Sequence, residues 1–363
     1  MFRPRSDNGL VISNRILTKC KTRAPTVCVP YGVVRIGSES FKGNVDVEEV
    51  YLPSTVRSID PYAFYGCVNL KRVHFIRGLV RIHPYAFYGC RSLLEAVLPE
   101  TVEGVGANAF AFCLSVRHAT LPGSLRVMGD FAFLKNVSLV SLDIRDGVKT
   151  ISSSAFEDCV SLEYVTLPDS ITTLKSLCFL GATSLKYVRF SKNLRSIGAC
   201  CFAYAVLEEA HLPETVTEIG PDAFEHCVKL TTVSFPAKTR RIPHQCFYQC
   251  ENLRYFKCPP ALEEIGCEAF DGCVNLSEAY FNDGLRAVGP RAFKDSNLKK
   301  ISLPQSVDVI HDQAFENVRA ESVRLPTRLP LLGQNVFDPY AFNNVTYYAP
   351  PPYPKDNLLT LLR

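Results

Sequence analysis

A phenylalanine, usually preceded by alanine, recurs along almost the whole chain at a nearly constant interval. Successive copies are 23 residues apart, except at three steps where the interval is 22. The recurring residues are Phe41, Phe64, Phe87, Phe110, Phe133, Phe156, Phe179, Phe202, Phe224, Phe247, Phe270, Phe293, Phe315 and Phe337. Self-similarity at a period of about 20 to 50 residues is typical of repeat architectures. Each interval therefore predicts one unit that buries its apolar side only against its neighbours.

Other apolar positions repeat in phase with the phenylalanine. In the segment 162–167, Val165 and Leu167 alternate with Tyr164 and Thr166. This alternation predicts a short strand that points one pair inward and the other outward. Pro168 then ends the strand, because proline has no N–H to donate. The spacing Leu-x-x-Val-x-Leu within such a period is typical of a leucine-rich repeat.

The segment before each phenylalanine carries a helix-start signal. In residues 59–64, Asp60 can cap a helix and Pro61 suits its first position. We therefore predict an α/β leucine-rich-repeat solenoid. It has one short parallel strand per repeat of 23 residues on the concave face, with short helices or helical turns on the convex face.

The sequence pattern of the repeats resembles that of the BspA-like leucine-rich repeat family. In residues 59–98 it reads Ile-x-x-x-Ala-Phe-x-x-Cys-x-x-Leu-x-x-Val-x-Leu-Pro. The resemblance extends from about Val27 to Pro350. It implies a solenoid with no catalytic or cofactor-binding residue, since members of the family are typically non-catalytic. Several members look like cell-surface proteins that bind host or matrix proteins.

The repeat phase predicts three segments. Residues 1–23 precede the first strand and are expected to form an N-terminal cap or arm. Residues 24–350 are expected to form the solenoid, with about 13 repeats. Residues 351–363 are expected to form a C-terminal cap or tail that covers the last open edge.

Composition and charge exclude several classes of protein. Apolar residues make up 47% of the chain and charged residues 21%, as in a packed protein and unlike a disordered chain. The 40 basic and 36 acidic residues are interleaved and leave a net charge of +4, so we expect no nucleic-acid partner. No apolar run approaches the ~20 residues of a membrane span, and no leader-like segment is evident. We expect a cytoplasmic protein, with the cell surface or extracellular space as the alternative.

The 15 cysteines follow the repeat phase rather than a pattern of disulfide pairs. One column, three residues after the phenylalanine, holds Cys67, Cys90, Cys113, Cys159, Cys227, Cys250 and Cys273. We expect reduced, buried thiols. A zinc site is the other interpretation, because several ligand types crowd into three repeats: His226, Cys227, His244, Cys246, Cys250, Cys258, Cys267 and Cys273. Their offsets within the repeat differ, so we predict no metal site and no cofactor.

Outward strand residues of successive repeats are expected to form one continuous surface, where neighbours lie about 4.8 Å apart. Tyrosine and arginine are favoured at protein-binding hot spots. The first candidate patch is Tyr164, Tyr187 and Arg189, and the second is Tyr255 with Tyr280. The same columns hold further candidates near the N-terminus: Arg72 and His74. The alternative is that these tyrosines simply suit strands.

The C-terminal Pro350-Pro351-Pro352-Tyr353 has two interpretations. Proline-rich segments adopt an extended helix that WW domains bind. The other interpretation, a plain chain exit after the last strand, is favoured.

No sequence signal brings a nucleophile, a base and an orienting group together. The sequence therefore predicts a non-enzymatic scaffold that binds one or more proteins through the concave sheet, within a larger assembly. The alternative is a cell-surface or secreted adhesin of the BspA-like type.

Overall fold

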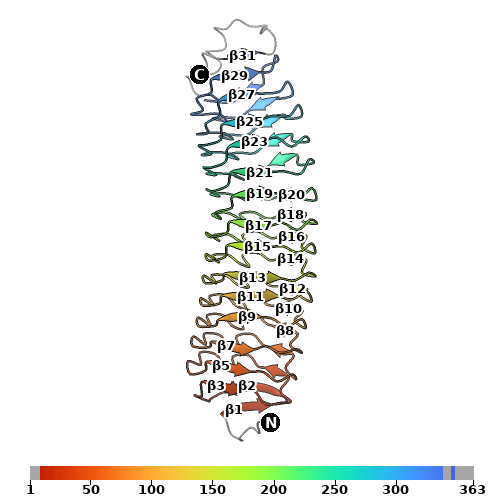
Figure 1. The fold of residues 1–363 in the computed structure, drawn as a ribbon, viewed down its shortest axis with the longest axis vertical. Coiled ribbons are helices and arrows are strands. Elements are labelled where there is room, and N and C mark those ends of the chain that lie inside the picture. The colour runs from red at the N-terminus through yellow and green to blue at the C-terminus, as the bar shows by residue number, and fades with distance from the viewer. Residues whose placement is uncertain (1–8, 338–344, 348–363) are drawn as a thin grey trace. The chain divides into compact units, whose positions relative to one another are not determined.

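The computed structural model describes residues 9–337 and the backbone of 345–347. Its contacts divide the chain into two compact units, Met1–Ser191 (unit 1) and Lys192–Arg363 (unit 2). Each unit is a coil of short parallel strands, and Figure 1 shows the strands of each unit as two columns.

The first column of strands in unit 1 is the one that the sequence predicts. Its members are β3 (Thr26–Cys28), β5 (Glu49–Tyr51), β7 (Arg72–His74), β9 (Glu95–Val97), β11 (His118–Leu121), β13 (Ser141–Ile144), β15 (Tyr164–Thr166) and β17 (Tyr187–Arg189). They pair in parallel as β3-β5-β7, β9-β11-β13 and β15-β17. Every pair joins residues at the same position in adjacent repeats. The outward side of these strands is the odd-strand face of unit 1.

A second strand in each repeat corrects the prediction of one strand per repeat. In unit 1 these strands are β4 (Arg35–Ile36), β6 (Ser58–Ile59), β8 (Arg81–Ile82), β10 (Gly104–Val105), β12 (Val127–Met128), β14 (Thr150–Ile151) and β16 (Thr173–Leu174). They also pair in parallel along the coil. Each has only two residues, too few to show the alternation by which a strand is recognised in a sequence.

An antiparallel hairpin begins the described part of unit 1. It joins β1 (Leu10–Ser13) to β2 (Ile16–Cys20), and β2 pairs in parallel with β4. Asn14 and Arg15 both have positive φ, as a two-residue hairpin turn of the favoured type requires. The hairpin lies inside the predicted 1–23 segment and extends the second column of strands, whereas the segment boundary itself stays a prediction.

Unit 2 repeats this organisation. Its first column, whose outward side is the odd-strand face of unit 2, contains β19 (Glu209–His211), β21 (Thr232–Ser234), β23 (Tyr255–Lys257), β25 (Glu278–Tyr280), β27 (Lys300–Ser302), β29 (Ser322–Leu325) and β31 (Val345–Tyr347). Its second column contains β18 (Ser196–Ile197), β20 (Glu218–Ile219), β22 (Arg241–Ile242), β24 (Glu264–Ile265), β26 (Ala287–Val288), β28 (Val309–Ile310) and β30 (Leu331–Leu332). The last strand of the first column in the described residues is β31.

The predicted helix before each phenylalanine is wrong. None of the residues in the described ranges lies in a helix, and this segment forms successive turns. In the repeat of Phe64, the Ala63 N–H donates to the Asp60 carbonyl at 3.2 Å, across Pro61 and Tyr62. Tyr62 has a φ of +60°, as the third residue of a type II turn requires, and proline is common at the second. The Asp-Pro signal fits this turn as well as it fits a helix start.

Alternate N–H groups of the same segment bond to the next repeat. The Phe64 N–H donates to the Ala86 carbonyl and the Gly66 N–H to the Tyr88 carbonyl, both at 2.8 Å. An α-helix would instead direct each N–H to the carbonyl four residues back in its own segment. The turns therefore satisfy their backbone groups and link successive repeats at the same time.

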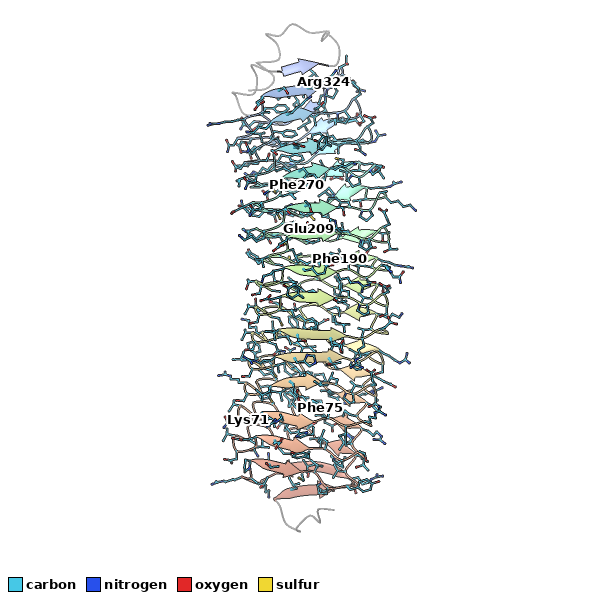
Figure 2. The ribbon with its side chains drawn as sticks, in the orientation of Figure 1. Lys71, Phe75, Phe190, Glu209, Phe270 and Arg324 are labelled. Carbon is cyan, nitrogen blue, oxygen red and sulfur yellow. The ribbon has the colours of Figure 1, made fainter. Side chains whose placement is uncertain are left out.

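The recurring phenylalanines fill the interior of each unit in a single file. In unit 1 the rings from Phe41 to Phe179 stack, with centroids 4.5 to 5.6 Å apart. In unit 2 the rings from Phe202 to Phe337 stack at 5.1 to 5.6 Å. Figure 2 labels Phe270, which is one of these buried rings, and Lys71, an exposed side chain at the outer edge of the coil. The predicted burial of each repeat's apolar side against its neighbours is confirmed within each unit.

The cysteine column forms a second ladder inside the coil. Each of its thiols is buried and donates to the carbonyl of the phenylalanine one repeat earlier, at 3.0 to 3.5 Å. Burial raises the pKa of Cys67 to about 12 and raises the others further. The expectation of buried thiols in this column is confirmed, and the hydrogen bond explains why a thiol suits the position better than a methyl group.

Candidate interaction surface

The odd-strand face of each unit presents alternate strand residues to solvent. In β15, Tyr164 and Thr166 are exposed while Val165 between them is buried. β17 has the same pattern, with Tyr187 and Arg189 outside. The inward and outward positions predicted from the alternation are therefore confirmed.

The first candidate patch lies near the C-terminal end of unit 1. Tyr164 pairs directly with Tyr187, and Thr166 pairs with Arg189, across the parallel strands β15 and β17. The two tyrosines are 60% and 54% exposed. The structure thus brings together the three residues that the sequence placed side by side, which we call the tyrosine patch (Tyr164, Tyr187, Arg189).

The second candidate pair, Tyr255 and Tyr280, lies on β23 and β25 of unit 2. Tyr255 pairs with Glu278, and Lys257 pairs with Tyr280, so the two tyrosines are diagonal neighbours. The Tyr280 hydroxyl donates to the Glu278 carboxylate on its own strand. Tyr280 also borders a half-open hollow of about 460 Å³ between β25 and β27, whose other lining residues include Asp283, Lys300 and Ser302.

Arg72 and His74 belong to a polar network on the odd-strand face near the N-terminal end of unit 1. His74 Nε2 lies 2.8 Å from Glu49 Oε1, and Arg72 Nε lies 3.4 Å from the same oxygen. The His74 ring stacks on the Tyr51 ring at 4.0 Å. The hydrogen bond with His74, with help from the Arg72 charge, lowers the pKa of Glu49. Contacts within the chain therefore hold these side chains in place.

Two groups of residues were missed by the sequence argument. The first is a set of ring stacks on the turn segments of unit 1: Tyr62 on Tyr85 and Tyr65 on Tyr88, each at 5.1 Å, with Tyr88 beside Phe112. The signal was present in the sequence, since the tyrosines recur two residues before and one residue after the phenylalanine.

The second group is a set of side chains in unit 2 that could hold a metal ion; His244 and Cys267 were among the zinc candidates of the sequence, whereas Glu268 was not. The ligand atoms of His244, Cys267 and Glu268 all lie within 4.8 Å of one another. The histidines and cysteines of this region differ as a group in their position within the repeat, which predicted that they lie apart. His244 and Cys267, however, each lie three residues before their phenylalanine, in consecutive repeats. Comparing offsets pair by pair would have found them.

The Pro350-Pro351-Pro352-Tyr353 motif lies outside the described residues. In the described part of the chain, no helix has the length and apolar character to cross a lipid bilayer.

The two strand columns and the ring stack within each unit define a solenoid of leucine-rich repeats. The family described as the BspA type leucine rich repeat region matches residues 11–137, 103–231 and 217–344. The chain therefore belongs to the BspA-type leucine-rich repeat family, which confirms the resemblance seen in the sequence.

Two solved structures, each with a TM-score above 0.5, support the same fold. A leucine-rich repeat protein from Bacteroides ovatus is 24% identical, with a TM-score of 0.80 over 96% of this chain and 98% of that one. One from Eubacterium ventriosum is 23% identical, with a TM-score of 0.54 over 81% and 82%. A leucine rich cell surface protein from Faecalibacterium prausnitzii is 22% identical, with a TM-score of 0.46 over 95% and 94%. A search of curated proteins gave no match.

Proposed function

We propose that this chain is a non-enzymatic protein-binding scaffold whose partner docks on the odd-strand face of unit 1, with the tyrosine patch as its main contact. One observation carries the proposal: two large aromatic side chains stand exposed on adjacent paired strands, with an arginine on the same face. Tyrosine and arginine at the centre of an interface supply much of its binding energy.

The backbone beneath the patch supports this role. The Leu167 N–H, at the end of β15, donates to the Arg189 carbonyl at 2.9 Å, and Val165 and Val188 between the exposed residues are buried. The patch is therefore preorganised, and binding costs little backbone entropy. Arg72 and His74 extend the proposed surface along the same face of unit 1.

The second patch supports a further contact region on the odd-strand face of unit 2. Tyr255 and Tyr280 are 41% and 57% exposed, and the hollow beside Tyr280 can receive a partner side chain. Lys300 and Asp283 line this hollow and offer one charge of each sign. We expect this region to adjust specificity through its charges, while the tyrosine patch contributes most of the affinity.

The test compares proteins retained from the source cell by the wild-type chain, by the Tyr164→Ala/Tyr187→Ala variant and by Tyr31→Ala. Tyr31 is 82% exposed and lies off the odd-strand face of the same unit, so it is a matched control. For each specific partner, we expect the double variant to weaken binding by about 30-fold or more, as hot-spot loss implies, with Tyr31→Ala unchanged. A partner that binds all three proteins equally would exclude the patch.

A second candidate function is that of a cell-surface or secreted adhesin, which membership in the BspA-type family favours. The comparisons give no support to the cytoplasmic location expected from the sequence, and one similar protein is named as a cell surface protein. The cysteines do not argue for the cytoplasm, because buried thiols of raised pKa resist oxidation in either compartment. Labelling of the chain by a membrane-impermeant reagent on intact source cells would favour the adhesin, and protection would favour the internal scaffold.

A further inference from the structure

Three side chains on the turn segments of unit 2 converge, and each offers a different metal-binding atom. His244 and Cys267 occupy the same position in consecutive repeats, and Glu268 follows Cys267. The Gln245 N–H donates to the Cys267 carbonyl at 2.9 Å, which fixes the two segments in register. The imidazole nitrogen, thiol sulfur and carboxylate oxygen all lie within 4.8 Å of one another.

A hydrogen bond to the backbone decides which ring nitrogen of His244 can bind a metal. His244 Nδ1 lies 3.0 Å from the Cys267 carbonyl oxygen. A carbonyl can only accept, so Nδ1 carries the proton and Nε2 keeps its lone pair. Metal-ligating histidines are usually fixed in this way, by donating their other ring N–H to a carbonyl or a carboxylate.

The Glu268 carboxylate is also held in place from both sides. The Gln245 amide donates to its Oε2 at 2.5 Å, and Arg291 Nη1 lies 3.3 Å from its Oε1. Each carboxylate oxygen has further lone pairs, and ligating carboxylates are in turn hydrogen-bonded. The arginine charge opposes a cation here, so the thiol and the imidazole must supply most of the affinity.

A neighbouring carboxylate, that of Asp222, interacts electrostatically with both His244 and Glu268. The Asp222 N–H donates to the His244 carbonyl at 3.0 Å, so Asp222 lies one repeat before the cluster. Its Oδ1 atom is buried and has no hydrogen-bond partner among the described residues. A buried carboxylate oxygen without a donor raises the local negative potential, which favours a cation nearby.

We propose that His244, Cys267 and Glu268 form a binding site for a zinc-class divalent ion on the turn segments of unit 2. Nitrogen, sulfur and oxygen together select zinc and its first-row neighbours over calcium and magnesium, which take oxygen ligands. Three protein ligands leave the fourth tetrahedral position to solvent. The site is separate from the proposed docking face and does not rest on it.

The experiment titrates the purified full chain, stripped of metal by a chelator, with Co²⁺ and then with Zn²⁺. We expect one equivalent of Co²⁺ to give thiolate-to-metal charge-transfer absorption, and Zn²⁺ to displace it, because thiolate ligands select zinc. Cys267→Ser and His244→Ala are each expected to weaken binding by at least about 100-fold, the upper end of what even an outer-shell change costs. Glu268→Gln, which keeps one acceptor oxygen and removes the charge, is expected to weaken it by about 10-fold.

Two controls match the ligand types at exposed positions elsewhere. Cys28→Ser removes an exposed thiol in unit 1, and His211→Ala removes an exposed imidazole in unit 2. Both should bind metal like the wild type. Absence of stoichiometric binding by the wild-type chain would overturn the proposal. Full affinity in both Glu268→Gln and one of the variants Cys267→Ser and His244→Ala would also overturn it. Far-ultraviolet circular dichroism checks that each variant is folded.

Discussion

At the scale of single residues, each repeat demands two backbone positions in the left-handed region. The residue two before each phenylalanine has positive φ, and so does the residue two after each of them from Phe41 to Phe315. Glycine occupies the second position only in some repeats: Gly43, Gly66, Gly89, Gly181 and Gly272. Other residues must adopt this backbone conformation where glycine is absent, such as Leu177 at the first position and Lys135 at the second. Each costs about 1 kcal/mol or more. The contacts between repeats must offset that cost.

Substituting glycine at this position isolates the conformational cost. Gly66 has a φ of +68° and open space around its missing Cβ, so Gly66→Ala should lose about 1 kcal/mol of unfolding free energy through strain alone. Gly104 has only ordinary contacts at 3.9 Å or beyond and is not among the positive-φ glycines, so Gly104→Ala should be neutral or stabilising by up to about 1 kcal/mol. Urea denaturation of both variants measures the difference. Equal effects would contradict the turn geometry.

The predicted site residues were found from strand periodicity, since alternation fixes which side chains point outward. Tyr164, Tyr187 and Arg189 lie together as expected because parallel pairing joins equal positions of neighbouring repeats. The cluster of His244, Cys267 and Glu268 was not predicted. Turn segments have no simple period that gives the direction of a side chain, so the equal positions of His244 and Cys267 in consecutive repeats were its one sequence signal.

At the scale of elements, the cysteine column shows how one position is adapted along the coil. Where the thiol is replaced, the replacement must fill the same space and satisfy its own polar atoms. Asn44 does so, since its Oδ1 accepts the Asp46 and Val47 N–H groups and its Nδ2 donates to the Thr22 carbonyl. Asn136 is fully buried and neither polar atom of its side chain has a partner among the described residues.

Restoring the thiol at this position should stabilise unit 1. Asn136→Cys removes two unsatisfied polar atoms and provides a donor for the Phe110 carbonyl, as Cys113 does for Phe87. We expect a gain of about 1 to 3 kcal/mol, the usual cost of a buried unsatisfied group. The matched variant Asn44→Cys should lose stability, since it breaks these three hydrogen bonds and a fourth, from Nδ2 to the Cys20 sulfur. Chemical denaturation of both proteins gives the sign of the change in unfolding free energy. A lower unfolding free energy in Asn136→Cys would contradict the claim that a thiol is favoured at this position.

The strand of the first column could be predicted because three to four alternating residues and a terminating proline are visible in the sequence. The two-residue strands of the second column could not. The Asp60-Pro61 signal predicted a helix, yet the coil uses these residues for a turn, because the N–H groups bond across to the next repeat. Tertiary pairing therefore outweighs the local preference.

At the scale of the whole chain, both units follow one rule. The interior is fixed by stacked rings, thiols and aliphatic side chains, whereas the outward positions vary from repeat to repeat. Our proposals accordingly place function on outward residues: the tyrosine patch on the odd-strand face of unit 1, and His244, Cys267 and Glu268 on the turn segments of unit 2. A change at an outward position should alter binding and leave the fold intact, because exposed substitutions usually change stability by less than about 0.5 kcal/mol.

The claim that buried residues fix the fold while outward residues do not is tested most directly by urea unfolding of two variants of unit 1, Phe110→Ala and Tyr31→Ala. Phe110 is fully buried between the rings of Phe87 and Phe133, whereas Tyr31 is 82% exposed. The stacked coil predicts a loss of about 3 to 5 kcal/mol for Phe110→Ala and a change within about 0.5 kcal/mol for Tyr31→Ala. Similar losses for the two variants would contradict it.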